Sequence, residues 1–360
     1  MLSDRHTRRS FFHGAGAARE LAGIASRPVE TVSPLDDRGS LIVSVCRRAM
    51  ACEFEVQLAA NRNDDSMEHV FEALDLVESL ESQMTVYRDD SEVVRLNREA
   101  AEQPVVVEPR LFDLFCQARQ LNEQTDGALD ITSGPLSEAW GFSRREGRVP
   151  SDDQIAEARA RVGMQYVALD GEKRTIAFHR PGMSVNLNSL GKGYALDRMA
   201  ELLAQHEVDD YLLHGGKSSV LARGNQPGSD GHGWRVAIRH PLRPAETLAE
   251  LILRNQSLST SGAGTQFFIR RGRRYGHILD PRSGYPAEGL YSATVLAPTA
   301  AEAEGLSTAF YVMGPERAGQ YCATRPEIAA LLVAPGAREG DVRLITFGLD
   351  SDRSDRASNS

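Results

Sequence analysis

The sequence predicts an α+β fold, in which helices are interspersed among hairpins of mostly antiparallel strands. Two observations lead to this prediction. Apolar residues recur at helical spacing in some segments and alternate with polar residues in others. These segments do not follow the regular strand–helix–strand order of a doubly wound parallel sheet, and no repeat of about 20–50 residues indicates a solenoid or propeller.

The N-terminal half is predicted to begin with a strand and to continue with helices. Residues 51–58 alternate between apolar and polar side chains, as a half-buried strand does. The apolar residues of 66–83 and of 110–123 each fall on one stripe of a helix. Between them, Ser91 is placed to cap a short helix, because its hydroxyl can accept a hydrogen bond from the first turn.

The C-terminal half alternates short strands with two helices. The predicted elements are a strand pair within 166–178, a helix over 192–205, several strands between 211 and 274, a helix over 300–312, and closing strands at 328–333 and 342–345. Turn residues separate the strands, and this pattern favours hairpins.

Composition excludes several classes of protein. The chain has 360 residues, of which 41% are hydrophobic and 25% charged, as in ordinary soluble proteins. Its net charge of −9 argues against a partner that is a nucleic acid. The four cysteines lack C-x-x-C spacing, which excludes zinc ribbons and thioredoxin-type chemistry, and Cys52 and Cys116 are expected in the core. No apolar run is long enough for a transmembrane segment.

The N-terminus leaves two locations open. Residues 7–12 resemble a twin-arginine export signal, which would place the protein on the periplasmic side, but Arg19 and Glu20 interrupt the apolar run that should follow. A disordered leader on a cytoplasmic protein is the alternative. We expect residues 1–40 to be a leader or disordered tail, 41–346 to be one domain, and 347–360 to be a polar disordered tail.

Two short motifs suggest chemistry that the surrounding sequence does not support. The G-x-G fragments that start at Gly14 and Gly262 lack the third glycine of a dinucleotide-binding fingerprint. Residues 189–192 match the S-x-x-K of penicillin-recognising enzymes, but no convincing partner motifs accompany them. A better interpretation is a tight loop entering a helix, where Lys192 and backbone groups could approach a pyrophosphate.

A series of polar and glycine-bearing motifs runs through the rest of the chain. They lie at residues 50–52, 84–87, 125–132, 186–195, 214–216, 259–262, 277–286 and 302–309. In this order and at these spacings the chain resembles the ApbE family of flavin transferases over about residues 41–345. The resemblance implies a single domain of two apposed α/β lobes, with a flavin cleft between them.

The activity that this resemblance implies is the Mg²⁺-dependent transfer of FMN from FAD, the substrate, to a threonine of a target protein, with release of AMP. The implied partner is a target flavoprotein that bears the acceptor threonine, and a homodimer is left open. By the same resemblance, a set of residues would bind FAD, and Tyr87 among them could stack on a ring. The set comprises Met50, Tyr87, Ala128, Leu129, Asp130, Asn186 and Lys192.

The resemblance also implies a metal site and a base. The Ser189 carbonyl, Glu304 and Thr308 would hold Mg²⁺, and the last two are four residues apart on one predicted helix face. His277 is the candidate general base for the acceptor threonine, because an imidazole with a near-neutral pKa suits that proton transfer. Asp280 would orient His277.

The chain departs from the family pattern, which has aspartate where this chain has Glu304, Asn186 and Lys217, and a polar residue and an aromatic where it has Ala263 and Gly264. Glu304 keeps the charge on a longer arm, whereas Asn186 and Lys217 lose a carboxylate. Two alternative functions follow. The protein could be a catalytically weak or inactive flavin-binding protein, or an FAD pyrophosphatase that gives FMN and AMP.

Overall fold

The structure is a computed structural model that describes residues 29–32, 42–59, 66–229, 231–264, 266–338 and 340–349. The twin-arginine-like segment at 7–12 and most of the predicted C-terminal tail lie outside these residues. Within the described part, none of the helices combines the length and apolar character needed to cross a bilayer.

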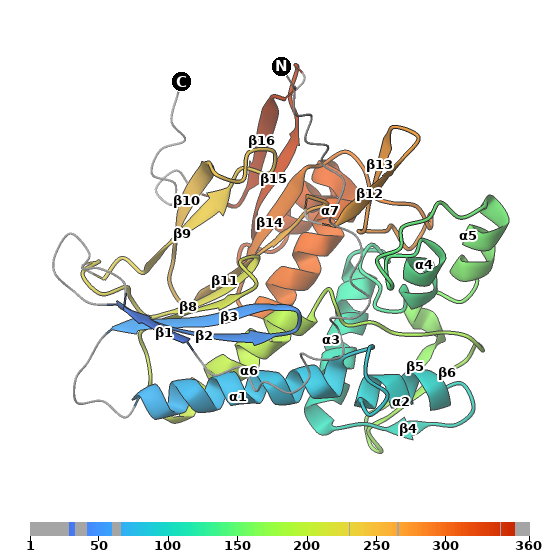
Figure 1. Cartoon of the computed structure of the whole chain (residues 1–360), viewed down its shortest axis with the longest axis horizontal. Helices are drawn as coiled ribbons and strands as arrows, with labels where there is room; N and C mark the ends of the chain where they lie inside the picture. The colour runs from blue at the N-terminus through green and yellow to red at the C-terminus, as the bar shows by residue number, and fades with distance from the viewer. Residues whose placement is uncertain are drawn as a thin grey trace, which may run out of the picture.

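A nine-stranded sheet dominates the molecule (Figure 1), and each neighbouring pair of its strands is antiparallel. Its strands, in spatial order, are β1 (Val29–Val32), β2 (Ile42–Ala49), β3 (Cys52–Ala59), β7 (Tyr211–Gly215), β8 (Ser219–Arg223), β11 (Gln256–Ser261), β14 (Ser292–Ala297), β15 (Ala329–Pro335) and β16 (Val342–Phe347). Strand β1 belongs to a segment that the sequence placed outside the fold, but it pairs with β2 along its whole length.

Three helices pack together against this sheet: α1 (Ser66–Met84), α6 (Gly191–Gln205) and α7 (Ala300–Ala323). Helix α7 runs beyond the predicted end at residue 312. It is interrupted at Gly314, whose φ of 77° breaks the helical backbone, and Pro315 then starts the second segment. Proline suits the start of a helix, because its missing N–H would have had no partner there.

The two central helices cap each other. Helix α6 begins after Leu190, which offers no capping side chain, and Glu304 of α7 accepts a hydrogen bond from the Gly193 N–H at 2.7 Å. In return, Asp197 of α6 accepts hydrogen bonds from Ala300 N at 2.7 Å and Ala301 N at 2.8 Å at the start of α7. A carboxylate at a helix N-terminus satisfies free N–H groups and complements the helix dipole.

The second lobe lies on the other side of α7 from most of the nine-stranded sheet (Figure 1). It contains α2 (Glu92–Glu99), α3 (Pro109–Gln124), α4 (Gly134–Ala139), α5 (Asp152–Arg159), a short 3-10 helix at Met164–Tyr166, and a sheet of β4 (Val105–Val106), β6 (Thr175–Phe178) and β5 (Val167–Asp170). Ser91 caps α2, as predicted, by accepting a hydrogen bond from Val94 N at 3.0 Å. Trp140 and Ile155 form a separate apolar cluster in this lobe.

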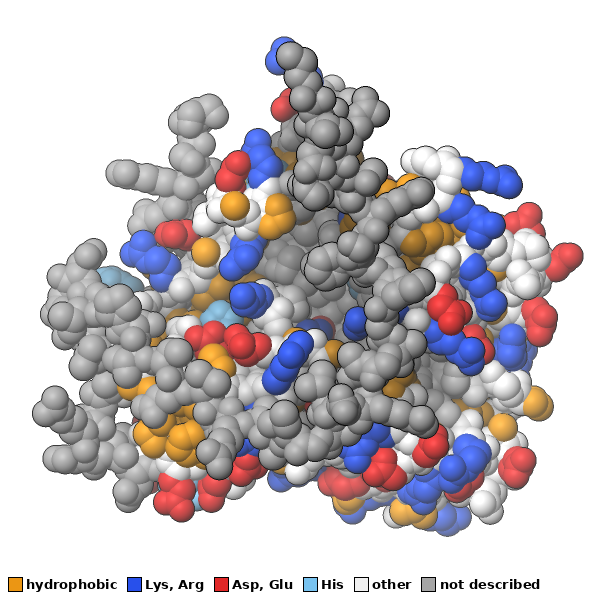
Figure 2. Space-filling view, in the orientation of Figure 1, with side chains coloured by type: hydrophobic (Ala, Val, Ile, Leu, Met, Phe, Trp, Pro, Cys, Tyr) orange, Lys and Arg blue, Asp and Glu red, His pale blue; other side chains and the backbone are white. Residues whose placement is uncertain are grey.

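Two hairpins complete the fold. The β9 (Trp234–Arg239) and β10 (Thr247–Leu253) hairpin buries apolar residues against the outer face of the large sheet. The hairpin of β12 (Phe267–Arg270) and β13 (Arg273–Gly276) packs Phe268 on the Trp140 cluster. Arginines crowd the tip of this second hairpin, and basic side chains gather over it in the space-filling view (Figure 2). The predicted α+β class with antiparallel sheets is confirmed.

Candidate active site

The predicted motifs converge at the N-terminal end of α6. The Lys192 ammonium group pairs with the Glu304 carboxylate, and both side chains are largely withdrawn from solvent, with exposed fractions of 24% and 4%. Close packing permits this contact, because a Cβ on Gly193 would lie only 2.2 Å from the Ala300 carbonyl oxygen. Glycine at 193 therefore brings α6 against α7 and places a buried ion pair, the Lys192–Glu304 pair, between them.

Five hydroxyl groups from β8, β11 and α7 lie near Glu304 and form hydrogen bonds with it or with one another. They belong to Ser219, Ser259, Ser261, Ser307 and Thr308. The Ser219 hydroxyl donates to Glu304 Oε1 at 3.5 Å, and the sheet register places Ser259 opposite it. Sequence reasoning missed Ser219 and Ser307. The one local pattern that indicates this group of hydroxyls is the spacing of Ser259 and Ser261, because alternate residues of a strand face the same side.

Thr308 lies one turn after Glu304, as predicted, and its Oγ1 donates to the Glu304 carbonyl at 3.2 Å. The hydroxyls of Thr308 and Ser261 are 3.1 Å apart. Ser189, the third predicted metal ligand, is half-buried in the turn that leads into α6.

This donor set fits Mg²⁺ in kind. Carboxylate, hydroxyl and carbonyl oxygens are hard ligands of the type that Mg²⁺ prefers. The ammonium group of Lys192 on Glu304 also shows that this position accommodates a positive charge. An ion bound to Glu304 would require Lys192 to move toward a ligand phosphate.

The turn between β2 and β3 borders the same region. Met50 and Ala51 adopt positive φ values of 50° and 57°, which makes a tight two-residue turn. It brings Cys52 against Gly216, where an added Cβ would lie 2.9 Å from the Cys52 Cβ and 3.8 Å from the Lys192 Cδ. Met50, the predicted FAD ligand in this turn, is therefore near Lys192.

Cys52 is a half-buried thiol beside the Lys192–Glu304 pair, whereas Cys116 is exposed, contrary to the core position that we expected for it. Burial raises the pKa of Cys52 to about 11, and the nearby Lys192 charge opposes this rise only in part. The Cys52 side chain is therefore a neutral thiol at pH 7, which is a poor nucleophile.

Tyr87 lies in the loop between α1 and α2 with an exposed fraction of 69%. Three residues before it, the Met84 Cε lies 3.9 Å from the position of a Cβ on Gly191, at the start of α6. The loop that carries Tyr87 therefore continues from the end of α1 that contacts the start of α6. An exposed aromatic ring in this position can stack on a planar ligand.

The turn over residues 125–132 is fixed mainly by internal contacts. The Asp130 carboxylate accepts hydrogen bonds from Thr132 N at 2.8 Å and from Thr132 Oγ1 at 2.6 Å. Burial raises the pKa of Asp130, and these hydrogen bonds oppose the rise. Ala128 and Leu129 are 2% and 1% exposed, so their side chains pack in the core. These side chains hold the turn in place; they do not reach toward solvent.

Asn186 joins this turn to the α6 entry. Its backbone N–H donates to the Ile131 carbonyl at 2.8 Å, and its Oδ1 accepts a hydrogen bond from Asn188 N at 3.0 Å. The predicted FAD-binding segments 128–130 and 186–192 thus lie side by side.

His277 has the hydrogen bonding expected of a base. Its Nδ1 donates to the Gln266 carbonyl at 3.0 Å. Because a carbonyl oxygen can only accept, the neutral ring carries its proton on Nδ1 and leaves Nε2 free to take another. Burial lowers the pKa of His277 below its usual 6.5, and the charge of Lys192 lowers it further. His277 is therefore neutral at pH 7 and lies within electrostatic reach of Lys192.

Asp280, which was predicted to orient His277, pairs with an arginine in the structure. Its carboxylate forms a two-pronged ion pair with Arg282, with Nε at 2.8 Å and Nη2 at 2.9 Å. Asp280 and Arg282 are two residues apart in a turn, in which the Gly284 N–H donates a hydrogen bond to the Asp280 carbonyl at 2.7 Å. The carboxylate thus shapes the loop, while the Gln266 carbonyl orients His277.

Comparison with known proteins gives a consistent result. The sequence model of the ApbE family matches residues 50–332. A Haemophilus influenzae protein named FAD:protein FMN transferase is 34% identical over 251 residues, which cover 68% of this chain and 72% of that protein. The protein of the same name from Escherichia coli K12 is 32% identical over 290 residues, covering 78% and 79%.

Solved structures agree with the sequence matches. The flavin transferase ApbE from Vibrio cholerae superposes with a TM-score of 0.74 at 28% identity, over 86% of this chain and 97% of that one. The apo form of the flavinyl transferase ApbE from Pseudomonas stutzeri gives 0.73 at 31% identity, over 89% and 98%. This chain belongs to the ApbE family.

Proposed function

We propose that this protein transfers FMN from FAD to a threonine of a target flavoprotein. The observation that carries the proposal is the position of His277, a neutral imidazole with a free Nε2 within electrostatic reach of Lys192. The curated relatives named FAD:protein FMN transferase support the same reaction.

In this reaction the threonine oxygen attacks the phosphorus on the FMN side of the pyrophosphate. His277 Nε2 takes the hydroxyl proton as the new P–O bond forms. The bond from that phosphorus to the bridging oxygen breaks, and AMP leaves with the bridging oxygen. The protein must therefore place a base on the acceptor side and positive charge on the phosphate side.

Lys192 is the positive group placed for the phosphates. It lies at the N-terminal end of α6, where the helix dipole favours an anion. We propose that Glu304, Thr308 and the Ser189 carbonyl hold Mg²⁺, which would neutralise charge on the phosphate oxygens. Tyr87, Met50 and the segments 128–130 and 186–188 would border the rest of FAD.

Mass spectrometry can test the reaction directly. The full chain would be incubated with FAD, MgCl₂ and an acceptor peptide containing one threonine, with the same peptide carrying valine as the control. The expected result is a threonine peptide heavier by one FMN minus one water, together with free AMP. An adduct on both peptides, or on neither, would contradict the proposal. Release of FMN and AMP without an adduct would identify a pyrophosphatase, and bound but uncleaved FAD a flavin-binding protein.

Location and assembly complete the proposal. A twin-arginine-like segment at 7–12 would export the protein to the periplasmic side, with the cytoplasm as the alternative. Fractionation of cells that express the Arg8→Lys, Arg9→Lys variant would distinguish the two locations. If the segment is an export signal, the variant should be lost from the periplasmic fraction. Light scattering would separate a homodimer from a monomer.

A further inference from the structure

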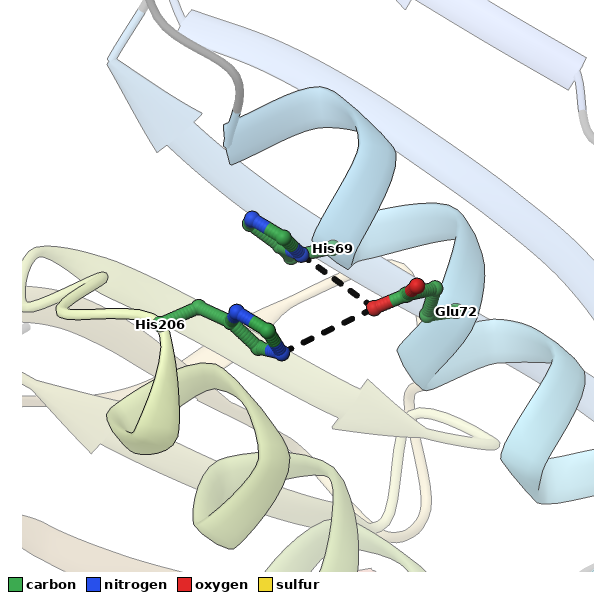
Figure 3. A group of neighbouring side chains, drawn as sticks. All are labelled: His69, Glu72 and His206. Carbon is green, nitrogen blue, oxygen red and sulfur yellow. Dashed lines mark hydrogen bonds and ion pairs between the residues drawn. The ribbon is translucent and has the colours of Figure 1, made fainter.

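Two histidines and a glutamate meet at the end of the α1–α6 pair (Figure 3). His69 and Glu72 are one turn apart on α1, and His206 follows the last residue of α6. Glu72 Oε2 lies 3.2 Å from His69 Nδ1 and 3.8 Å from His206 Nε2. The exposed fractions of the three side chains are between 21% and 49%, so solvent ions can reach them.

Packing of the two helices holds these residues together. Met84, at the C-terminal end of α1, contacts the start of α6, while His69 and His206 meet at the opposite ends. The helices are therefore antiparallel. Both helices bury apolar side chains in the same core, with Val77 of α1 and Met199 of α6 among them. The backbone positions of all three side chains are thus set by the core.

The three groups have the spacing of metal ligands. Zn²⁺ binds imidazole nitrogen and carboxylate oxygen at about 2.0–2.2 Å in a tetrahedron, which separates neighbouring ligand atoms by about 3.3–3.5 Å. The two measured separations, 3.2 and 3.8 Å, bracket that value, and all three ligand atoms lie within 4.8 Å of one another.

One rearrangement is needed before all three can bind the same ion. The imidazole rings are stacked, with centroids 3.6 Å apart and planes within 10°. A metal binds in the plane of an imidazole, so parallel rings cannot both aim at one ion. A rotation about the side-chain torsions would tilt them, and the partial exposure of both rings leaves space for it.

We propose that His69, Glu72 and His206 form a second metal site, specific for a borderline transition-metal ion such as Zn²⁺. Two imidazoles and one carboxylate suit Zn²⁺ rather than Mg²⁺, which prefers oxygen ligands. Three protein ligands leave a fourth position for water. The site lies about 20 Å from Lys192, because Lys192 and His206 are fourteen residues apart along α6 at a rise of about 1.5 Å each.

A metal here acts as a clamp between two helices. It connects the N-terminal part of α1 to the C-terminal end of α6. The opposite end of α1 precedes Tyr87, and the opposite end of α6 carries Lys192. An ion that binds only the folded state raises the folded-to-unfolded ratio by a factor that grows with the free ion concentration relative to Kd. At a concentration of 100 times Kd, the folded-to-unfolded ratio rises about 100-fold. This inference does not rest on the proposed transfer reaction.

Calorimetry with ZnCl₂ and the full chain, free of any histidine tag and stripped with EDTA, tests the site. We expect one ion per chain and a rise in Tm with zinc. The variants His206→Ala and Glu72→Gln should each weaken binding at least tenfold and reduce the rise in Tm. His179→Ala removes an exposed histidine elsewhere and should leave both unchanged. Melting curves in EDTA establish that each variant folds.

Substitution with Co²⁺ identifies the ligands. A nitrogen–oxygen site gives visible d–d bands without an intense thiolate charge-transfer band, and His206→Ala should abolish those bands. A charge-transfer band from the cysteines, zinc binding that is unchanged in the His69→Ala, His206→Ala double variant, or no binding to the parent chain would each overturn the proposal.

Discussion

Helix α6 has titratable side chains in opposite settings at its two ends. At the N-terminal end, Lys192 meets the buried carboxylate of Glu304 between two helices. Just past the C-terminal end, His206 lies at the surface beside Glu72 and His69. At the N-terminal end, Lys192 and Glu304 pair with each other, and Glu304 also accepts a hydrogen bond from the backbone of α6. At the C-terminal end, the side chains are accessible to solvent and to ions.

A substitution should therefore alter stability more at the buried N-terminal end of α6 than at its exposed C-terminal end. A buried charge that loses its partner cannot recover the interaction from water, whereas an exposed charge can. Glu304 also caps α6, so one side chain supports the ion pair and the helix start. In the surface cluster, the side chains of Glu72 and His206 stay partly exposed to solvent. Substitutions at the two ends of α6 and in the site test this contrast.

Glu304→Ala should reduce both stability and activity. It leaves Lys192 unpaired and the Gly193 N–H without its acceptor, and breaking a buried ion pair costs about 3–5 kcal/mol. Urea unfolding measures this free energy, and AMP release from FAD measures the activity. The burial of Glu304 predicts a loss of stability in addition to the loss of metal binding. A change below about 1 kcal/mol would show that the pair is not a structural element.

His277→Gln should slow FMN transfer by about 10²–10⁴-fold, because it removes the proposed base. FAD affinity should change little, which calorimetry can check. A comparable loss of affinity and rate would instead make His277 a binding residue.

The pH dependence of the rate gives a second test of His277. Burial lowers the pKa of His277 below 6.5, so the ring stays neutral as pH falls to that value and is protonated only in more acidic solution. The acid limb of the rate profile should therefore lie below pH 6.5 in the parent chain and disappear in His277→Gln. A limb above pH 6.5 would contradict this assignment.

Tyr87→Leu should weaken FAD binding roughly 2–10-fold, because ring stacking contributes about 0.5–1.5 kcal/mol. The exposed ring makes little contribution to the core, so the free energy of unfolding should stay unchanged. Fluorescence titration with FAD measures the first quantity and urea unfolding the second. Unchanged affinity would place the flavin elsewhere.

His206→Ala in EDTA should change the free energy of unfolding by no more than about 0.5 kcal/mol, as expected for a surface position. Urea unfolding beside Glu304→Ala compares the two ends of α6 directly. A loss in His206→Ala as large as that in Glu304→Ala would refute the contrast between them.

Local patterns in the sequence were sufficient to predict most of the elements. The alternation of β3, the apolar stripe of α1 and the cap at Ser91 depend on residues a few positions apart. Strand β14 was not predicted, because all of its residues are buried between α7 on one face and the β9–β10 hairpin on the other. A strand buried on both faces shows no alternation for sequence analysis to detect.

Motifs in the sequence indicated the candidate site residues, but not the partners that these residues contact. The amino-acid sequence specifies which polar groups the chain carries, and its family motifs indicate which of these groups are candidates for the active site. Tertiary structure decided that Glu304 meets Lys192, 112 positions away, and that Ser219 joins them. Such pairs form because Gly193 lets two helices approach, and this packing depends on the whole core. The histidine cluster has the same origin, since the antiparallel packing of α1 and α6 brings together residues that no local pattern connects.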